Sequence, residues 1–445
     1  MTTDASPSYA RSSQAEASAT PTPRDVIRRG LPRRYAAERR FKIYGIAAII
    51  FSLAFLSVLF ASIISKGYTS FVQSTFHVSV FLDPKVVDPA SKRDQDALLM
   101  ADYRALAVDA LAKALEVDQR DQRDAGAVAA LLSQGVDVQI RKAVLDDPAL
   151  IGKRVDLWLL ASDNVDALIK GSFDRSIAES LRKLSNRQLA WVDKAYASGL
   201  LRLRFNTGFF TYGASSQPET AGIGVALIGS LFMMLTVIVL ALPLGVAAAA
   251  YLQEFAPKNR LTDVIEVNIN NLAAVPSIVF GILGLAIFIN MAGLPRSASL
   301  VGGLVLTLMT LPTIIIATRA AIGAVPPSIR EAAIGVGASD MQILMHHVLP
   351  LAFPGILTGT IIGLAKALGE TAPLLMIGMV AFVVAYPQTP LDPSTALPVQ
   401  IYMWATAAQR GFVERTSGAT LILLLFLACM NLIAIILRSR LERRW

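Results

Sequence analysis

The sequence has almost no cysteine and little histidine. Cys429 is the single cysteine among 445 residues, so the chain cannot form a disulfide or a cysteine metal site by itself. His77 has no second histidine or cysteine nearby, and the other two histidines, His346 and His347, are adjacent. This is not the ligand set of a structural metal site. We therefore expect no metal centre, and we place His346 and His347 at a membrane surface.

A phosphate-binding loop is also missing. Gly152-Lys153 is followed by Arg154 and has no upstream glycine, so it does not match Gly-x-x-x-x-Gly-Lys-Ser/Thr. The segment 65–221 contains no catalytic constellation. We expect this chain to bind no nucleotide or other cofactor and to catalyse no reaction, so any ATP and Mg²⁺ would be used by another subunit.

Charged residues are scarce. Only 17% of the residues are charged and 54% are hydrophobic, with a mean hydropathy of +0.53. A typical soluble domain has about 25% charged residues. A membrane-spanning helix needs roughly 20 apolar residues. By that measure six segments are long enough to span, namely 43–64, 223–250, 272–292, 300–317, 351–385 with a polar interruption, and 419–437.

The two ends of the chain account for its whole net charge of +8. Residues 1–42 sum to +5 and residues 438–445 to +3. Basic residues next to membrane spans favour the cytoplasmic side. We therefore expect a multi-pass protein with both termini in the cytoplasm, a largely disordered tail at 1–42 and a first span at 43–64. The basic ends are a topology signal, and we see no nucleic-acid-binding patch.

Residues 65–221 differ in character from the rest. They contain twenty basic and twenty acidic residues and, given this topology, lie outside the cytoplasm. Residues 76–82 and 155–160 are rich in β-branched and aromatic residues, which predicts strands. Residues 94–132 and 164–197 have helical Leu and Ala spacing. We predict a mainly α membrane protein with a small α+β extracytoplasmic domain inserted between spans 1 and 2.

A polar segment, 326–350, lies between two of the apolar runs. Ser328 and Glu331 have the spacing of a capping box, and Gly337 suits a turn with positive φ. Ser339 or Asp340 can cap a second short helix, which we expect Pro350 to end. A simple polar loop is the alternative interpretation.

Lys366 and Glu370 are four residues apart within the fifth apolar run. On a continuous helix they would lie one turn apart on one face. An ionisable group at the centre of a bilayer costs on the order of 2.5–3.5 kcal/mol, so such residues normally face protein or a water-filled path. The two residues either line a translocation path or its gate, or form a structural ion pair, with each other or across a subunit interface.

Four motifs together resemble the PstA permease family of bacterial phosphate importers, which are ABC transporters. They are Leu-Ala-Ala-Val-Pro-Ser-Ile-Val-Phe-Gly at 272–281, Arg-Glu-Ala-Ala at 330–333, Leu-Pro-Leu-Ala-Phe-Pro-Gly at 349–355 and Gly-Glu-Thr-Ala-Pro at 369–373. The resemblance covers roughly residues 205–445. Lys366 stands where the family commonly has an arginine.

The resemblance implies a type I ABC importer permease fold over 222–437 in a bacterial inner membrane. It implies a translocation path or gate at Lys366, Glu370 and Thr371. It also implies a loop that couples to the ATPase, formed by Arg330, Glu331, Ala332, Ala333, Gly337, Leu349 and Pro350. The implied partners are a PstC-like second permease, two PstB-like ATPase subunits, a PstS-like periplasmic phosphate-binding protein and membrane lipid.

Two alternative functions stay open at this point. The chain could be a permease for another oxyanion, such as molybdate or sulfate. It could instead be a membrane-anchored sensor whose extracytoplasmic domain binds a ligand. Composition alone does not identify phosphate, and the role of residues 65–221 is open.

Overall fold

The computed structural model describes residues 23–89, 93–117 and 122–441. It divides into two compact units, residues 1–62 and 63–445. The first consists of most of α1, Pro23–Gly67. Predicted disorder at 1–22 lies outside the described residues, but 23–42 are helical, which the sequence analysis missed. The stretch Ala36-Ala37-Glu38-Arg39-Arg40 explains this, because it consists of strong helix formers.

The sheet domain, as we name residues 68–221, contains one antiparallel sheet of order β2-β1-β3. Its strands are β1 Val72–Phe81, β2 Arg154–Leu160 and β3 Leu201–Phe205. Both predicted strands are confirmed. In β1, Phe76, Val78 and Val80 are buried while alternate residues are exposed, because successive side chains point to opposite faces.

The helices of the sheet domain are shorter than predicted. The helix expected at 94–132 is three helices, because the middle one, α4, is closed at both ends. Asp102 caps its start, and Glu116 ends it with a left-handed φ of 58°. The helix expected at 164–197 is two, the second starting at a Ser185–Gln188 capping box. The described helices are α2 Pro84–Val87, α3 Gln95–Met100, α4 Tyr103–Leu115, α5 Gln122–Ala129, α6 Val136–Asp146, α7 Asp163–Ile169 and α8 Asn186–Ala197.

The core of this domain lies between the helices and one face of the sheet. Tyr103 and Leu111 of α4 and Ile140 of α6 are fully buried against Phe76 and Leu159. The other face of the sheet carries polar and aromatic side chains, among them His77 and Trp158, whose rings stack at 4.4 Å. The sheet domain therefore has one covered and one open face.

The membrane half is helical, and the chain is a multi-pass membrane protein. Among the residues that the structure describes, five helices are long and apolar enough to cross a membrane, or six if a bent pair counts as one span. The long helices are α1, α10 Gly224–Ala250, α13 Ser299–Gly323, α16 Leu349–Gly369 and α19 Gly411–Leu441. The shorter helices are α9 Thr207–Thr211, α11 Arg260–Ala273, α12 Ser277–Gly284, α14 Pro327–Gly335, α15 Asp340–Gln342, α17 Ala372–Met376 and α18 Leu397–Ala405.

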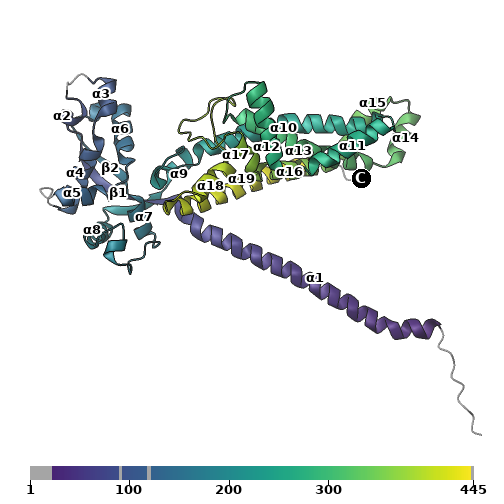
Figure 1. Ribbon diagram of the computed structural model, residues 1–445, viewed down its shortest axis with the longest axis horizontal. Helices are drawn as coiled ribbons and strands as arrows, with labels where there is room; N and C mark the ends of the chain where they lie inside the picture. Colours follow the sequence, from purple (N-terminus) through teal and green to yellow (C-terminus); the bar gives the residue numbers. More distant parts are fainter. Residues whose placement is uncertain (1–22, 90–92, 118–121, 442–445) are drawn as a thin grey trace, which may run out of the picture. The chain divides into compact units, whose positions relative to one another are not determined.

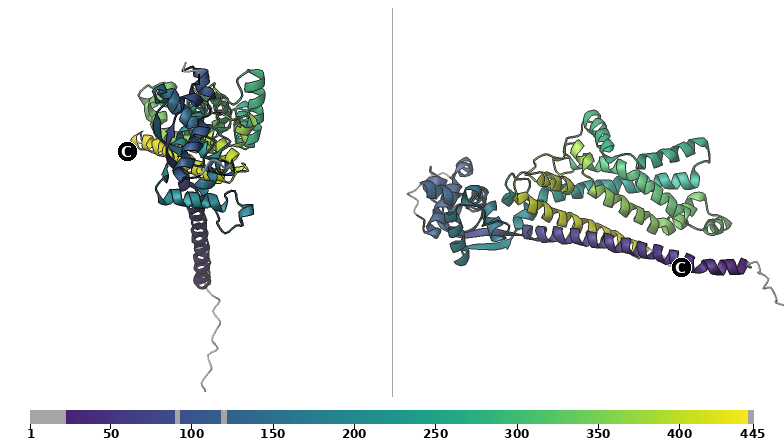
Figure 2. Two further views of the ribbon diagram at one scale, coloured as in Figure 1. Left: turned by 90° about the vertical axis from the view of Figure 1, so that its left-hand side faces the viewer. Right: turned by 60° about the horizontal axis from the view of Figure 1, so that its bottom comes forward.

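Two of the predicted spans are broken. The third is a pair, α11 and the helix 277–291, bent by 101° at Val275-Pro276. The helix of the fifth, predicted at 351–385 with a polar interruption, ends at Gly369. Residues 370–385 are not part of it, and a short α17 follows. Within residues 63–445, the sheet domain and α14 lie at opposite ends (Figures 1 and 2).

Candidate functional site

Lys366 lies in the last turn of α16 and is exposed, whereas Glu370 and Thr371 are half-buried beyond the helix end. Glu370 has extended backbone, with φ −82° and ψ 127°. The expected placement of Lys366 and Glu370 one turn apart on one helix face is therefore wrong. No ion pair or side-chain hydrogen bond joins them among the described residues. The positive charge instead lies at the negative end of the α16 dipole, which favours a cation.

Proline explains why the helix stops there. In a continued helix, Pro373 would have no N–H for the carbonyl group of Gly369, four residues earlier, and its ring would clash with that carbonyl. The Gly-Glu-Thr-Ala-Pro motif thus forms a break between α16 and α17, with Glu370 and Thr371 at the break.

This break packs directly on the other proline motif. A Cβ atom added to Gly281 in α12 would lie 2.7 Å from Pro373 Cα and 2.9 Å from Pro373 O. Only glycine allows such close backbone approach, which is typical of helix contacts in membranes. The motifs at 272–281 and 369–373 are far apart in the sequence but meet in the fold. Lys366 lies in the last turn of α16, before the break whose Pro373 meets Gly281.

The polar segment forms a helix, a glycine turn and a second helix. Gly337 has φ +85°, as predicted, and the Ala338 N–H donates to the Ala333 carbonyl oxygen at 3.0 Å. Ser339 caps α15 in a reciprocal capping box with Gln342. The prediction of a Ser328–Glu331 capping box is wrong. The residue that caps α14 is Pro326, with no side-chain hydrogen bond, because Pro327 already has the backbone suited to a first helical residue.

Pro350 does not end the second helix, which is a further correction. The helix runs without interruption from Asp340 to Gly369 and includes a π-helical stretch, Ile343–Val348. Pro350 is the second residue of α16, and the π-helical stretch before it locally replaces the regular α-helical hydrogen bonds that a proline disrupts. The second helix of the polar segment and the fifth span are thus one continuous helix.

Arg330 anchors α14 to the membrane half. Its guanidinium group donates to the backbone oxygens of Val325 at 2.6 Å and Ile322 at 2.9 Å, just after and within α13. It also forms an ion pair with Glu254 at 2.9 Å. Each contact is charge-assisted and stronger than a neutral hydrogen bond. Arg330 therefore points back toward the bundle and positions the turn.

The outer side of this turn is apolar and exposed. Val336 is 84% exposed, and Ile334, Met341 and Met345 are also exposed. Of the residues predicted for coupling, Glu331, Ala332, Gly337 and Pro350 are exposed, Leu349 is half-buried and Ala333 is buried. Exposed apolar residues gathered at one turn are typical of a protein-binding surface.

A second polar cluster was not foreseen. We call it the charged joint, and it links the sheet domain to the start of α19. Its members are Asp163, Asp166, Lys170, Glu219, Glu414 and Arg415. The Lys170 side chain is only 3% exposed, and its Nζ contacts Asp166 at 2.6 Å and Glu414 at 2.7 Å. Glu414-Arg415 just before an apolar run is the one sequence signal, but it does not reveal partners so distant in the sequence.

The charged joint contains four acids and two bases, so its carboxylates are not all compensated. Burial raises the pKa of Glu219, whose Oε2 has no hydrogen-bond partner among the described residues. Burial and the nearby Asp166 raise the pKa of Asp163. Arg415 is 3% exposed and lies 5.7 Å from the centre of the Phe209 ring. The joint therefore connects the sheet domain to the last span through ion pairs and buried carboxylates.

Comparisons with known proteins match both halves of the chain. Residues 28–179 match a domain of unknown function, DUF3333, and residues 241–445 match the binding-protein-dependent transport system inner membrane component. The phosphate transport system permease protein PstA 1 of Mycobacterium tuberculosis is 32% identical over 246 residues, which cover 54% of this chain and 78% of that protein. The chain belongs to the PstA family of ABC transporter permeases.

The chain is also similar to other permeases. The PstA permease of Methanocaldococcus jannaschii is 32% identical over 46% of this chain and 73% of that protein. The probable ABC transporter permease YqgI of Bacillus subtilis is 34% identical over 40% of this chain, which spans 60% of that protein. A structure of the MetNI methionine ABC transporter is 18% identical over 50% of this chain and 95% of that chain, with a TM-score of 0.39. As a PstA-family member, the chain is a transport subunit and not an enzyme.

Proposed function

We propose that this chain is the translocating permease subunit of an ATP-driven importer of inorganic phosphate. One observation carries the proposal: a lysine is exposed in the last turn of a membrane helix, before the break whose Pro373 packs on Gly281. The PstA relatives, named as phosphate transport permeases, match this same half of the chain. A lone cation in this position suits the passage of an anion.

Lys366 is proposed to contact the anion, with Glu370 and Thr371 at the flexible break that follows it. A lysine facing lipid would be costly, so we expect a second permease or a water-filled path to cover it. An ammonium group attracts an oxyanion as a point charge without gripping it bidentately. Such weak binding is compatible with passage, because a translocation site must also release its substrate.

The turn around Gly337 is proposed to dock on a cytoplasmic ATPase, which would use ATP and Mg²⁺. Its exposed apolar residues provide the contact surface, and Arg330 fixes the turn on the bundle. We further propose that the sheet domain is extracytoplasmic and that both termini are cytoplasmic, an orientation that the basic ends favour. The further partners are a second permease and an extracytoplasmic phosphate-binding protein.

Uptake of radiolabelled phosphate by the assembled transporter, at matched expression, tests this function. Lys366→Gln should reduce uptake by about tenfold or more, since loss of one charge-assisted contact is a change of about that size. Lys366→Arg should retain uptake, and Lys85→Gln, which removes an exposed charge in α2, is the matched control. Full uptake by an assembled Lys366→Gln transporter would exclude the path role. Uptake of radiolabelled sulfate or molybdate that excess phosphate does not inhibit would assign another oxyanion.

A further inference from the structure

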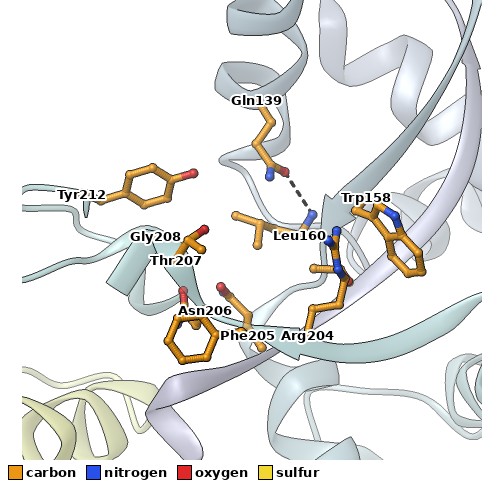
Figure 3. Close-up of a pocket in the computed structure, with 11 residues that line it drawn as sticks. Gln139, Trp158, Leu160, Arg204, Phe205, Asn206, Thr207, Gly208 and Tyr212 are labelled. Atoms are coloured by element: carbon orange, nitrogen blue, oxygen red, sulfur yellow. Dashed lines mark hydrogen bonds between the residues drawn. The ribbon is translucent and has the colours of Figure 1, made fainter. Parts of the chain in front are cut away.

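We propose that the sheet domain carries its own oxyanion-binding site, separate from the translocation path. A cavity of about 150 Å³ lies between the open face of the sheet, α6 and the segment that leads toward α10. Figure 3 shows side chains that reach it from all three. The residues that line it are Gln73, Thr75, Gln139, Trp158, Leu160, Arg204, Phe205, Asn206, Thr207, Gly208 and Tyr212.

The cavity is rich in hydrogen-bond donors. Within the described residues, its lining has an arginine and no Asp or Glu. Gln139 Oε1 accepts a hydrogen bond from the Leu160 N–H at 3.0 Å, which fixes the orientation of the Gln139 amide group. Among the described residues, the Nε2 of the same amide has no hydrogen-bond partner. The hydroxyl of Tyr212 faces the same space from the opposite wall (Figure 3). Gln139, Tyr212, Thr207 and Arg204 thus offer donors without an internal acceptor.

The other polar residues of the lining are already committed. Asn206 donates to the Ser70 carbonyl oxygen at 3.0 Å and accepts from the Phe209 N–H at 3.0 Å. Gln73 Nε2 donates to the Glu219 carbonyl oxygen at 2.7 Å. These bonds fix the walls of the cavity and leave the four donors for a ligand.

Arg204 is held in place for this role. Its guanidinium carbon lies 4.7 Å from the centre of the Trp158 ring, a cation–π contact that limits the positions of the side chain. Trp158 in turn stacks on His77. A planar guanidinium with free N–H groups matches the paired oxygens of phosphate or a carboxylate. A cation would be repelled, so the chemistry favours a small oxyanion, for which inorganic phosphate is the probe.

Occupancy would connect the sheet to the start of the second span. Thr207 and Tyr212 belong to the segment before α10, and the Gly224 N–H at the start of α10 donates to the Tyr212 carbonyl oxygen at 3.0 Å. Tyr386 Oη donates to the Thr211 carbonyl oxygen at 2.8 Å from the loop beyond α17. A ligand bridging Arg204 and Tyr212 would restrain both connections. The site is therefore positioned to sense an oxyanion outside the path.

Equilibrium binding of radiolabelled phosphate to the full chain in phosphatidylcholine nanodiscs, without the ATPase or the binding protein, tests the site. Arg204→Gln should weaken binding about tenfold or more. Gln139→Glu keeps the acceptor for the Leu160 N–H but places a carboxylate among the donors, so it should abolish binding. Arg202→Gln, which removes an equal charge two residues away outside the lining, should bind like the wild type.

Lys366→Gln separates this site from the translocation path. Binding that survives Lys366→Gln but is lost in Arg204→Gln supports the site, even where phosphate uptake turns out not to be the transport function. Absence of saturable binding, or wild-type binding by both Arg204→Gln and Gln139→Glu, would overturn it. Repeating the titration in nanodiscs that contain phosphatidylglycerol distinguishes free phosphate from a lipid headgroup as the natural ligand. If phosphatidylglycerol displaces phosphate only when Arg204 is present, a lipid headgroup provides the oxyanion.

Discussion

At the scale of single residues, three residues have clear and different roles. Lys366 presents a charge at the end of α16, Gly281 lets two chain segments touch, and Arg330 holds the coupling turn. The motifs alone suggested that Arg330 takes part in docking. Its three acceptors all lie within the chain, so its effect on a partner is through positioning.

Arg330→Gln should loosen α14 without preventing insertion. The charge-assisted bonds to Ile322, Val325 and Glu254 are each typical of contacts that contribute about 1.5–3 kcal/mol. Hydrogen exchange of α14 amides should therefore accelerate. Glu331→Gln on the same helix is the control and should leave exchange unchanged. Equal protection in both variants would show that Arg330 does not anchor the helix.

Gly281→Ala should disrupt the junction beside Lys366. The new methyl group would approach Pro373 backbone atoms at 2.7 to 2.9 Å, so α12 or α17 must shift. We expect lower thermal stability and reduced uptake. Gly323→Ala is the matched control, because the nearest atom to its new methyl group is at 3.7 Å. If the Gly281→Ala and Gly323→Ala variants have the same melting temperature and the same phosphate uptake, the close contact of Gly281 with Pro373 is not important for the fold or for transport.

At the scale of elements, uninterrupted apolar runs in the sequence form uninterrupted membrane helices in the fold. Long apolar runs predicted α10, α13 and α19, because a bilayer requires internally satisfied backbone hydrogen bonds. The break after Gly369 was missed, although Pro373 was visible. Pro312 and Pro354 lie inside helices of the same domain, so proline by itself does not reveal where a membrane helix ends.

Contacts between distant segments could not be predicted. The strand β3 was missed because Leu-Arg-Leu-Arg-Phe is short and gains its place from pairing with β1. The contact of Gly281 with Pro373 and the charged joint also join residues far apart in the chain. Each motif was recognisable in the sequence, whereas the geometry that brings two motifs together depends on tertiary packing.

Gly337→Val should impair coupling through backbone strain alone. No atom lies within 4 Å of a Cβ at this position, but its φ of +85° disfavours a β-branched residue by roughly 1–2 kcal/mol or more. We expect normal insertion with loss of ATPase stimulation. Gly335→Ala has the same open surroundings and a negative φ, so it should couple normally. Full ATPase stimulation by the Gly337→Val variant would show that this turn is not the docking element.

At the scale of the whole molecule, the charged joint makes attachment of the sheet domain sensitive to pH. Burial raises the pKa of Asp163 and Glu219 above 3.8 and 4.5. The folded protein then holds more protons than the unfolded chain in the window above those values. The contribution of these two carboxyl groups to the free energy of unfolding is therefore complete below pH 3.8 and 4.5, respectively. It falls as the pH rises through the pKa of each group in the folded protein.

Glu219→Gln should remove part of this dependence. A neutral amide cannot ionise, so the variant should lose less stability than the wild type as the pH rises from 4 toward neutral. Thermal unfolding of the full chain in nanodiscs measures the difference. Asp146→Asn, an exposed acid on α6, is the control and should keep the wild-type profile. An unchanged slope in Glu219→Gln would assign the dependence to other groups.

The uninterrupted helix from Asp340 to Gly369 has a mechanical consequence. At a rise of about 1.5 Å per residue, roughly 40 Å separates the glycine turn from Lys366 on one stiff rod. A displacement applied at the turn must reach the lysine as a translation or rotation of that rod. The π-helical stretch Ile343–Val348 is where its winding can change, because one turn there already holds an extra residue. Force applied in the cytoplasm thus has a direct route to the depth at which the anion would pass.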